Sequence, residues 1–556
     1  MDCVPPAFQQ QPDQGPALTI GISSFLVNYG KDARILHPEL IFKPTARTDS
    51  KEKKAPIVAV MRLSLFSSLL GALTALTATA SAKPCKRPHG SITLVEGEPS
   101  FTFDYETDSP NDSNWIGIYT PGSGPVNGEY SGTPSAAWDW AGGAEGRLFI
   151  PTSNLAPGTY EAYFLWDGGY VVIGEPLEVE LTRAPGPLEF VVESVTLKNG
   201  REGQEYEADL SGLLVGGGDI NVTFSVKNGD WVQVSEDGVL SGTPSASGTT
   251  EVTVVATTSD DTVLELAVSI PVVASGESLV TELTVLTYNL WHGGSQMSNY
   301  HAKQVRFLAG GNFDIVIFQE STGDHASRLG KALGWNSFQS GGSVGIISRY
   351  PIAEVYSEKN YRGAVRVALD GEDNQINVWG VHLGYTPYGP YDFCFDKMTV
   401  DEVLVREDES NRGPQIRETV GLMKDHLDNT DNIPVILAGD FNAPSHLDWT
   451  DDNKHCGVGY VPWPTSEVPT AAGLVDSYRV AHPDPASKPG ITWSPIYLDN
   501  NGRPEPLDRI DFVYYKGGLE VLSSEAIVVG EPKPMPNHID NEWTSDHDAV
   551  VVKYKL

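Results

Sequence analysis

Residues 434–445 read PVILAGDFNAPS, and the chemistry of the C-terminal half is organised around this stretch. It begins with a run of apolar residues closed by a glycine, which predicts a short buried strand. Asp440 and Asn442 would then emerge at the carboxyl end of that strand, where α/β sheets usually present their functional groups. Asp, Asn, Gly and Pro are also the residues that turns prefer, so the stretch alone indicates a turn or a functional site equally well.

The segment after residue 280 has the pattern of an α/β domain. Apolar strand-like runs alternate there with longer stretches of helical periodicity. Within residues 412–429, four apolar side chains recur on one helical face: Ile416, Val420, Met423 and Leu427. At 556 residues the chain is too long for one hydrophobic core. We therefore predict a multidomain protein whose last domain, residues 280–556, is α/β.

Six strand-like runs of this domain begin or end at carboxylate, amide or imidazole side chains. In chain order these side chains are Asn289, Glu320, His382, Asp440 with Asn442, Asp508 with Asp511, and Asp546 with His547. One such position means little, but six in order predict a single site. Hard oxygen ligands suit Mg²⁺, Mn²⁺ or Ca²⁺, whereas zinc would want more His or Cys. The set favours a metal-assisted attack of water on a phosphoester, without a covalent intermediate.

These motifs resemble those of the endonuclease/exonuclease/phosphatase superfamily, which includes DNase I-like nucleases, neutral sphingomyelinases and inositol-polyphosphate phosphatases. The resemblance is carried by YNLW, QES, VHLG, GDFN, DRIDF and SDHD, and it runs from about residue 283 to residue 556. It implies a four-layered, DNase I-like α/β sandwich. It also implies a metal-dependent phosphoric ester hydrolase.

The resemblance implies which residues bind the metal and the phosphate. Glu320 would be the main metal ligand, helped by Asn289 and Asp546. The cation would be Mg²⁺, or else Mn²⁺ or Ca²⁺. Asn442 and His382 would hold phosphate oxygens.

The resemblance also implies how the proton is handled. His547, polarised by Asp511, would act on the scissile phosphate as an acid, a base or a charge stabiliser. Asp440 would orient or deprotonate the attacking water. The sequence LDRID offers two aspartates as the partner of His547, and Asp511 is favoured over Asp508.

Two stretches of the N-terminal half predict β-sandwich modules. Residues 87–182 contain short runs rich in aromatic and β-branched residues, and they resemble an Ig-like or C2-like module. Residues 188–273 resemble the Ig-like or cadherin-like spacer family through GVLSGTP at 238–244. Linkers at 183–187 and 274–277 separate the three domains. In the first module, Trp115, Trp138, Trp140 and Trp166 would either line a surface that contacts a sugar or lipid or pack in the core, and core packing is favoured. Contact of the β-sandwich modules with a glycan or a cell surface is therefore one interpretation.

Met61 begins the run MRLSLFSSLLGALTALTATASA, which has a basic start, an apolar centre and a small-residue end. This is the layout of a signal peptide, so we expect one at residues 61–82 and a secreted protein. Residues 1–60 would then be an over-extended gene model or a disordered segment. A signal anchor is the alternative, and no other stretch is long and apolar enough to span a membrane. Asn111 and Asn221 lie in glycosylation sequons, which is consistent with secretion.

The chain is strongly acidic, with 73 Asp and Glu against 38 Lys and Arg and a net charge of −35. Acidity repels nucleic acids and anionic membranes at long range. A polyanionic substrate would therefore have to be met by metal ions and a local basic patch. This favours a small or exposed phosphodiester over long duplex DNA.

Two aromatic and acidic insertions, residues 384–410 and 449–469, follow the VHLG and GDFN motifs. Both should overhang the site. In an oxidising compartment a Cys394–Cys456 disulfide would join them, and two buried free thiols are the alternative. Nearby aromatic side chains would stack on a base or sugar, face a lipid headgroup, or pack locally: Tyr385, Tyr388, Tyr391, Trp449, Trp463 and Trp493.

We therefore expect phosphodiester hydrolysis by a metal- and His/Asp-activated water. The substrate would be a nucleic acid, a phospholipid headgroup or a small phosphodiester. The alternatives are an extracellular nuclease, a sphingomyelinase-like phospholipase C or a phosphomonoesterase. A different class altogether is a surface-binding or adhesion protein whose catalytic domain is silent.

Overall fold

The computed structural model describes residues 88–95, 101–131, 133–150, 152, 155, 158–181, 187–217 and 220–556. The predicted N-terminal extension, the predicted signal peptide and nearly all of the 183–187 linker lie outside the described residues. Among the helices that are described, none has the length and apolar content to cross a membrane.

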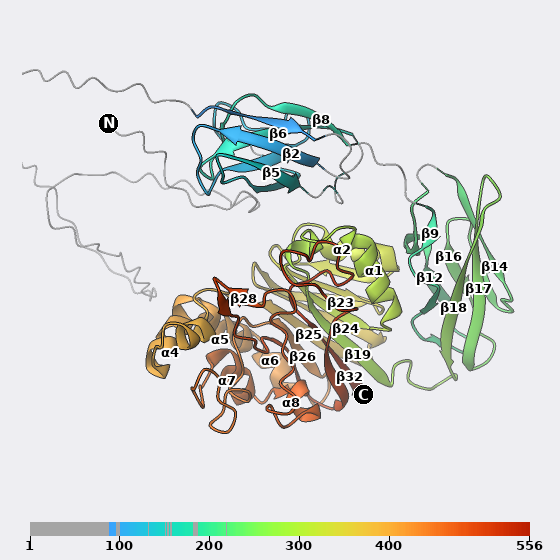
Figure 1. The fold of residues 1–556 in the computed structure, drawn as a ribbon. Coiled ribbons are helices and arrows are strands. Elements are labelled where there is room, and N and C mark those ends of the chain that lie inside the picture. Colours follow the sequence, from blue (N-terminus) through green and yellow to red (C-terminus); the bar gives the residue numbers. More distant parts are fainter. Residues whose placement is uncertain are drawn as a thin grey trace, which may run out of the picture. The chain divides into compact units, whose positions relative to one another are not determined.

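The described chain before residue 280 consists mainly of strands (Figure 1). Its sheets have the strand orders β1-β2-β5, β4-β3-β6-β7 with β8 on β6, β10-β18-β17-β14 with β11 on β18, β12-β16-β15, and β13-β9. The strands are β1 (Gly90–Leu94), β2 (Phe101–Thr107), β3 (Trp115–Tyr119), β4 (Ala137–Trp140), β5 (Glu145–Ile150), β6 (Gly158–Trp166), β7 (Val171–Val172), β8 (Leu177–Leu181), β9 (Glu189–Phe190), β10 (Ser194–Thr196), β11 (Gly200–Arg201), β12 (Tyr206–Asp209), β13 (Leu214–Val215), β14 (Val222–Lys227), β15 (Val232–Val234), β16 (Val239–Gly242), β17 (Gly248–Thr258) and β18 (Val263–Val273). The prediction of β-structure is confirmed, and the grouping into two separate sandwiches stays a prediction.

The C-terminal domain is built on two six-stranded sheets, with orders β21-β22-β20-β19-β32-β31 and β23-β24-β25-β26-β30-β27. The strands of the first sheet are β19 (Glu282–Asn289), β20 (Ile315–Gln319), β21 (Asn336–Gln339), β22 (Val344–Ser348), β31 (Glu520–Ile527) and β32 (Ala549–Lys555). Those of the second are β23 (Ile352–Lys359), β24 (Arg362–Asp370), β25 (Asn374–His382), β26 (Val435–Asp440), β27 (Val475–Asp476) and β30 (Asp511–Lys516). A short pair, β28 (Asp499–Asn500) and β29 (Arg503–Pro504), completes the strands.

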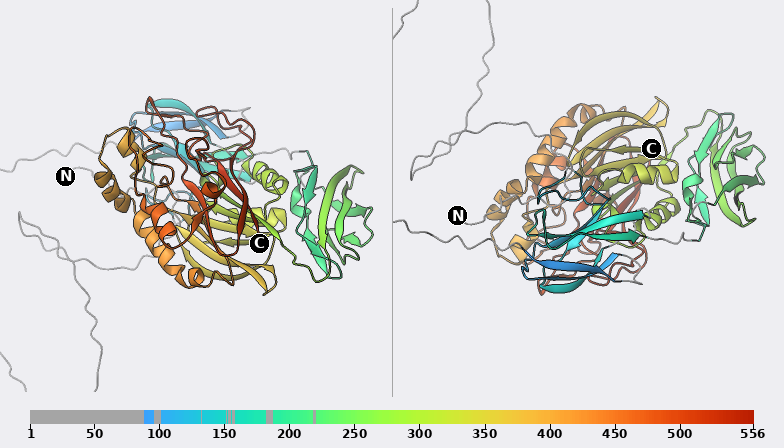
Figure 2. Two further views of the ribbon diagram at one scale, coloured as in Figure 1. Left: turned by 90° about the horizontal axis from the view of Figure 1, so that it is seen from below. Right: turned by 90° about the horizontal axis from the view of Figure 1, so that it is seen from above.

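The helices lie outside the two sheets (Figures 1 and 2). They are α1 (Tyr300–Gly310), α2 (His325–Leu333), α3 (Gly389–Cys394), α4 (Val400–Glu409), α5 (Arg412–Leu422), α6 (Lys424–Asp428), α7 (Pro464–Ala471) and α8 (Ser477–Ala481). The helix predicted within 412–429 corresponds to α5 and α6. Of its four predicted apolar positions, Ile416, Met423 and Leu427 are buried and Val420 is half-buried.

Alternation of side chains along the strands produces the layers. In β26, Ile436 and Ala438 face the core between the two sheets, while Val435 and Leu437 face the core that contains α5 residues. In β20, Ile315 and Ile317 join the inter-sheet core, whereas Val316 and Phe318 join the core that contains α1 and α2 residues. Three cores therefore separate helices, sheet, sheet and helices, which is the predicted four-layered DNase I-like domain.

The α1–α2 core extends into the preceding β-rich segment. It includes Leu213 at the end of the 3₁₀ turn Ser211–Leu213, together with Leu333 of α2. The turn approaches α2 so closely that a Cβ atom on Gly212 would lie 2.5 Å from Ala332 Cα. Residues of the 188–273 segment and of the C-terminal domain therefore share a hydrophobic core.

Gly212→Val should destabilise the protein. The new side chain would strike the α2 backbone, and overpacking of this kind costs about 1–3 kcal/mol. Thermal unfolding followed by circular dichroism measures the effect. Gly310→Ala is the control, because beyond the neighbouring residues and backbone of α1 the added Cβ meets no described atom within 4 Å, and alanine favours the helix. An unchanged melting temperature in Gly212→Val would contradict the shared core.

Candidate active site

The predicted site residues gather at one end of the two sheets. Strands β19 and β20 are parallel, as are β25 and β26, so their carboxyl ends point the same way within each pair. Strands β32 and β30 run antiparallel to their neighbours β19 and β26. The amino ends of β32 and β30 therefore lie beside the carboxyl ends of β19 and β26. His382, Asp440 and Asp511 are direct neighbours across three strands, in that order. The strand pairing therefore places these predicted side chains next to one another.

Asp440 lies at the centre of the assembled side chains and is almost fully buried. Its Oδ2 accepts N–H bonds from Asn289 Nδ2 at 3.1 Å and Asn442 Nδ2 at 3.2 Å. Its Oδ1 accepts the backbone N–H of Asn442 at 2.8 Å. The imidazole Nε2 atoms of His382 and His547 lie 3.7 and 3.8 Å from Oδ2. The carboxylate is thus fixed by amides and flanked by two imidazoles.

Asn442 has both side-chain N–H groups engaged. The second one donates to the carbonyl oxygen of Leu383 at 2.9 Å, and φ of Asn442 is +52°, a conformation that asparagine tolerates better than most residues. In this arrangement Asn442 orients Asp440. A direct contact of Asn442 with a phosphate oxygen would have to replace one of these bonds.

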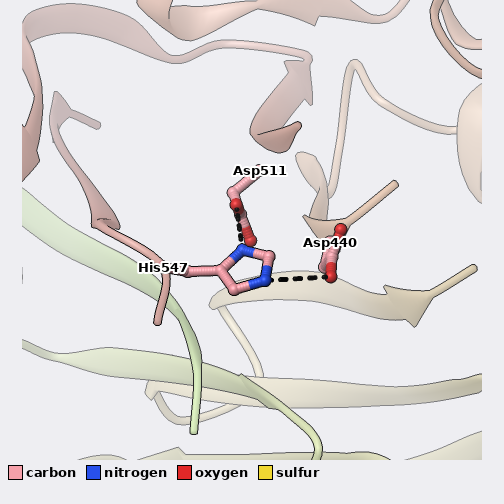
Figure 3. A group of neighbouring side chains, drawn as sticks. All are labelled: Asp440, Asp511 and His547. Atoms are coloured by element: carbon pink, nitrogen blue, oxygen red, sulfur yellow. Dashed lines mark hydrogen bonds and ion pairs between the residues drawn. The ribbon is translucent and has the colours of Figure 1, made fainter. Parts of the chain in front are cut away.

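His547 is paired with Asp511, as Figure 3 shows. Its Nδ1 lies 2.8 Å from Asp511 Oδ2, and both side chains are buried. Asp508 instead accepts the indole N–H of Trp449 at 2.8 Å. The choice of Asp511 over Asp508 as the partner of His547 is therefore correct.

The buried carboxylates set the electrostatics of this cluster. Burial raises the pKa of Asp440 to about 6, and repulsion from Asp511 adds to the effect. Burial by itself lowers the pKa of His547, but the carboxylates of Asp511 and Asp440 outweigh it and hold that pKa well above its usual value. The geometry therefore favours an imidazolium between two carboxylates.

Glu320 and Asp546 form the second acidic part of the site. Glu320 follows β20 with a φ of +51°, an uncommon backbone conformation for glutamate, and its Oε2 accepts the backbone N–H of His292 at 2.6 Å. Burial raises the pKa of Glu320, but the imidazoles of His292 and His382 outweigh it and lower the pKa. Burial raises the pKa of Asp546 well above its usual value, and repulsion from Glu320 contributes.

Two groups of side chains are able to hold a cation. Ligand atoms of Asp440, Asp511 and His547 lie within 4.8 Å of one another, but all three side chains already have hydrogen-bond partners. Asp546 Oδ1 is a buried carboxylate oxygen without a hydrogen-bond partner among the described residues, as is Asp511 Oδ1, and Asp546 Oδ1 lies 4.0 Å from His547 Nε2. Because Glu320 repels Asp546, a divalent cation between them would stabilise both charges. The residues of the Glu320 group therefore fit a hard cation.

The side chain of Asn289 is largely engaged in hydrogen bonds with other residues. Its Oδ1 accepts the backbone N–H of Trp291 at 2.9 Å, and its Nδ2 points to Asp440. Only the second lone pair of the carbonyl oxygen remains for a metal. The predicted roles of Asn289, Glu320 and Asp546 as ligands stay predictions.

Ser343 and Trp493 are additional site residues that the strand-end pattern did not single out. Ser343 Oγ donates to the Asn360 carbonyl at 3.0 Å and lies 3.0 Å from His382 Nδ1, so it orients that imidazole. Its surrounding sequence, GGSVG, matches the G-x-S-x-G pattern of hydrolase nucleophiles. That pattern acts on a strand-to-helix turn, whereas Ser343 directly precedes strand β22. The Trp493 ring packs edge-on against His547, with centroids 5.0 Å apart.

Two sequence comparisons match the C-terminal half of the chain. The sequence profile described as "Endonuclease/Exonuclease/phosphatase family" matches residues 286–547. A Caenorhabditis elegans relative, uncharacterized protein F14F9.5, is 32% identical over 291 residues, covering 49% of this chain and 91% of the relative. The chain belongs to the endonuclease/exonuclease/phosphatase family. Members of this family are typically hydrolases that act on phosphoesters.

Several solved structures of other proteins match about half of this chain. Truncated TDP2 from Caenorhabditis elegans is 16% identical, with 50% of this chain and 98% of that chain covered and a TM-score of 0.34. The human Nocturnin catalytic domain, solved with a bound sulfate anion, is 17% identical, with 50% and 96% covered and a TM-score of 0.32.

The two insertions of this family member form a small folded unit beside the site. Cys394 and Cys456 are joined by a disulfide with Cα atoms 5.1 Å apart, as predicted. Trp449 and Trp463 are fully buried in a core with Phe393. For these two tryptophans local packing is confirmed, and stacking on a substrate is wrong. Of the remaining aromatic candidates, Tyr385 is clearly exposed, whereas Tyr388, Tyr391 and Trp493 are half-buried.

Asp508 should make stability depend on pH. Burial raises its pKa from 3.8 to about 7, so between these values the folded protein binds a proton that the unfolded chain has released. Stability therefore falls as pH rises through this window, by up to roughly 4 kcal/mol for this group. Urea unfolding from pH 4 to pH 8 should show a smaller decline for Asp508→Asn than for the wild type. Parallel curves for the two proteins would contradict a protonated Asp508.

Proposed function

We propose that the C-terminal domain hydrolyses phosphodiesters with a divalent cation, Mg²⁺ being the first choice. The single observation that carries the proposal is the pairing of His547 with Asp511 beside the buried Asp440 carboxylate. A charged imidazole next to a fixed carboxylate suits attack of water on a phosphate group. Membership of a family of phosphoester hydrolases supports the same reaction.

Glu320 and Asp546 would hold the cation, with Asn289 supplying a carbonyl oxygen. The repulsion between Asp546 and Glu320 supports this choice, as does Asp546 Oδ1, which accepts no hydrogen bond from the described residues. When bound, the cation would neutralise charge on the phosphate and orient it. Mn²⁺ and Ca²⁺ are alternatives with the same oxygen preference.

The side chains of the cluster would then handle the proton and the phosphate. Asp440, fixed by two amides, would orient the attacking water and accept its proton. His547, held by Asp511, would place positive charge at Nε2 against the phosphate and protonate the leaving oxygen. His382, oriented by Ser343, would bind a phosphate oxygen.

The substrate we propose is a small or exposed phosphodiester, because the net charge of −35 disfavours a long DNA duplex. A nucleic acid end or a phospholipid headgroup belongs to the same class. We also propose that the protein is secreted. The signal-peptide pattern at residues 61–82 and the Cys394–Cys456 disulfide support secretion. Glycan or cell-surface contact through the N-terminal β-rich segment is proposed on its exposed Tyr130 and Trp140.

The decisive test is a screen of purified residues 83–556 with and without Mg²⁺ or Mn²⁺. The substrates are DNA, RNA, sphingomyelin, inositol phosphates and bis-p-nitrophenyl phosphate. Cation-dependent turnover of a phosphodiester is expected. Turnover of monoesters alone would replace the proposed diesterase by a phosphatase, and no turnover of any substrate would favour a silent domain.

A further inference from the structure

Arg412, the first residue of α5, is a fully buried charge near the active site. Its Nε donates to Glu407 Oε2 at 2.8 Å, and both side chains have no exposed surface. Its remaining N–H groups donate to backbone carbonyls from two other segments. These are Asn442 O at 2.5 Å, Gly384 O at 3.0 Å, Tyr385 O at 3.4 Å and Pro387 O.

The carbonyls that Arg412 binds lie where the sheet hydrogen bonds end. His382 and Asp440 are the last paired residues of β25 and β26, and Leu383 N donates one further bond to Asp440 O at 3.0 Å. Beyond this point the segments that follow the two strands continue into the insertions. Buried carbonyls need hydrogen-bond donors, and Arg412 supplies N–H donors to both segments.

The clamped segments carry site residues. Gly384 lies two positions after His382, and the Asn442 carbonyl belongs to the residue whose side chain orients Asp440. Arg412 therefore fixes the spacing of the two turns that present His382 and Asp440. A shift of either turn would move a side chain relative to the phosphate.

A contribution to stability alone does not explain the buried Arg412–Glu407 ion pair. A buried ion pair often contributes little or no net stability, because both charges lose their hydration. Glu407 Oε1 even lacks a hydrogen-bond partner among the described residues. The planar fork of arginine is able to reach carbonyls in several directions, whereas lysine presents one compact charge.

We propose that Arg412 is a positioning residue for the active site, holding the turns after β25 and β26 in register through the Asn442 and Gly384 carbonyls. The proposal rests on the proposed phosphodiester hydrolysis. Glu407 neutralises the buried guanidinium. Arg412, which follows the 384–410 insertion, thus contributes to catalysis without touching the substrate.

The test is Arg412→Lys in residues 83–556, assayed with bis-p-nitrophenyl phosphate and Mg²⁺. We expect kcat to fall roughly 100-fold, the effect of a misplacement of about 1 Å, with KM and Mg²⁺ affinity little changed. Arg349→Lys is the matched control. Arg349 is also a buried arginine, bound to Asn312 at 2.9 Å, and it follows β22 at the opposite end of the sheet. An equal loss of kcat in both variants, or none in Arg412→Lys, would overturn the proposal.

Hydrogen–deuterium exchange separates this inference from the proposed activity. In Arg412→Lys, amides of residues 383–388 and 441–446 should exchange faster, while those of α1 should not change. Unchanged exchange in the two turns overturns the clamp even if the wild type hydrolyses nothing. If Arg412→Lys does not fold, Glu407→Gln keeps the guanidinium fork. It should retain most of the wild-type kcat, and loss of kcat comparable to that of an active-site variant would overturn the role of the fork.

Discussion

His547→Ala should lower kcat for a phosphodiester by about 10²–10⁴-fold, the usual contribution of a positioned acid–base group. The imidazole is buried, and its Nδ1 is held at 2.8 Å by Asp511. Alanine removes the positive charge beside Asp440 and the proton for the leaving oxygen. Initial rates with bis-p-nitrophenyl phosphate and saturating Mg²⁺ measure the loss. Circular dichroism should show that the fold is retained.

A matched pair of aspartates tests the orientation of that imidazole. Asp511→Asn should also reduce kcat strongly, because the amide no longer stabilises the imidazolium. Asp508→Asn makes the same chemical change three residues away, at a carboxyl that contacts Trp449 instead. It should leave kcat near the wild-type value. Equal losses in the two variants would contradict a specific His547–Asp511 pair.

Glu320→Gln should weaken Mg²⁺ binding by more than about 100-fold, because loss of a direct ligand exceeds the 10–100-fold effect of losing an outer partner. The amide keeps the size of the side chain but removes the charge that faces Asp546. Isothermal titration calorimetry with Mg²⁺ gives the affinity without any substrate. The control is Glu354→Gln, an exposed side chain 3.5 Å from Arg366.

The result of Glu320→Gln also decides between the two cation-binding groups. If Mg²⁺ affinity is unchanged, the Asp440, Asp511 and His547 group becomes the better candidate for the cation. In that case His547 could not act as the charged group proposed here. A parallel loss of affinity in Asp546→Asn is expected if Glu320 and Asp546 share the ion.

Local sequence patterns were sufficient to predict which strand ends carry the site residues. The apolar run of β26 and the alternation in β20 are short-range signals, and strands of known direction bring their ends together. This is why Asp440 and His547 could be named from the sequence, whereas the preference for Asp511 over Asp508 came from the family resemblance. The disulfide followed from two cysteines in neighbouring insertions.

Other features depend on contacts that no local pattern contains. Arg412 lies in a helical stretch typical of any amphipathic helix, and only the fold shows that its guanidinium reaches Asn442 and Gly384. Ser343 became relevant because His382, 39 residues later, lies beside it. The burial of Trp449 likewise reflects packing within the insertions, which aromatic composition alone could not distinguish from a binding surface.

The central claim is that a fixed Asp440 and a divalent cation act together on a phosphodiester. The most direct measurement is the rate of p-nitrophenol release from bis-p-nitrophenyl phosphate by the wild type and by Asp440→Asn, each with Mg²⁺ and with a chelator. Release only by the wild type with Mg²⁺ is predicted. Equal release by Asp440→Asn, or release that survives the chelator, would contradict the claim.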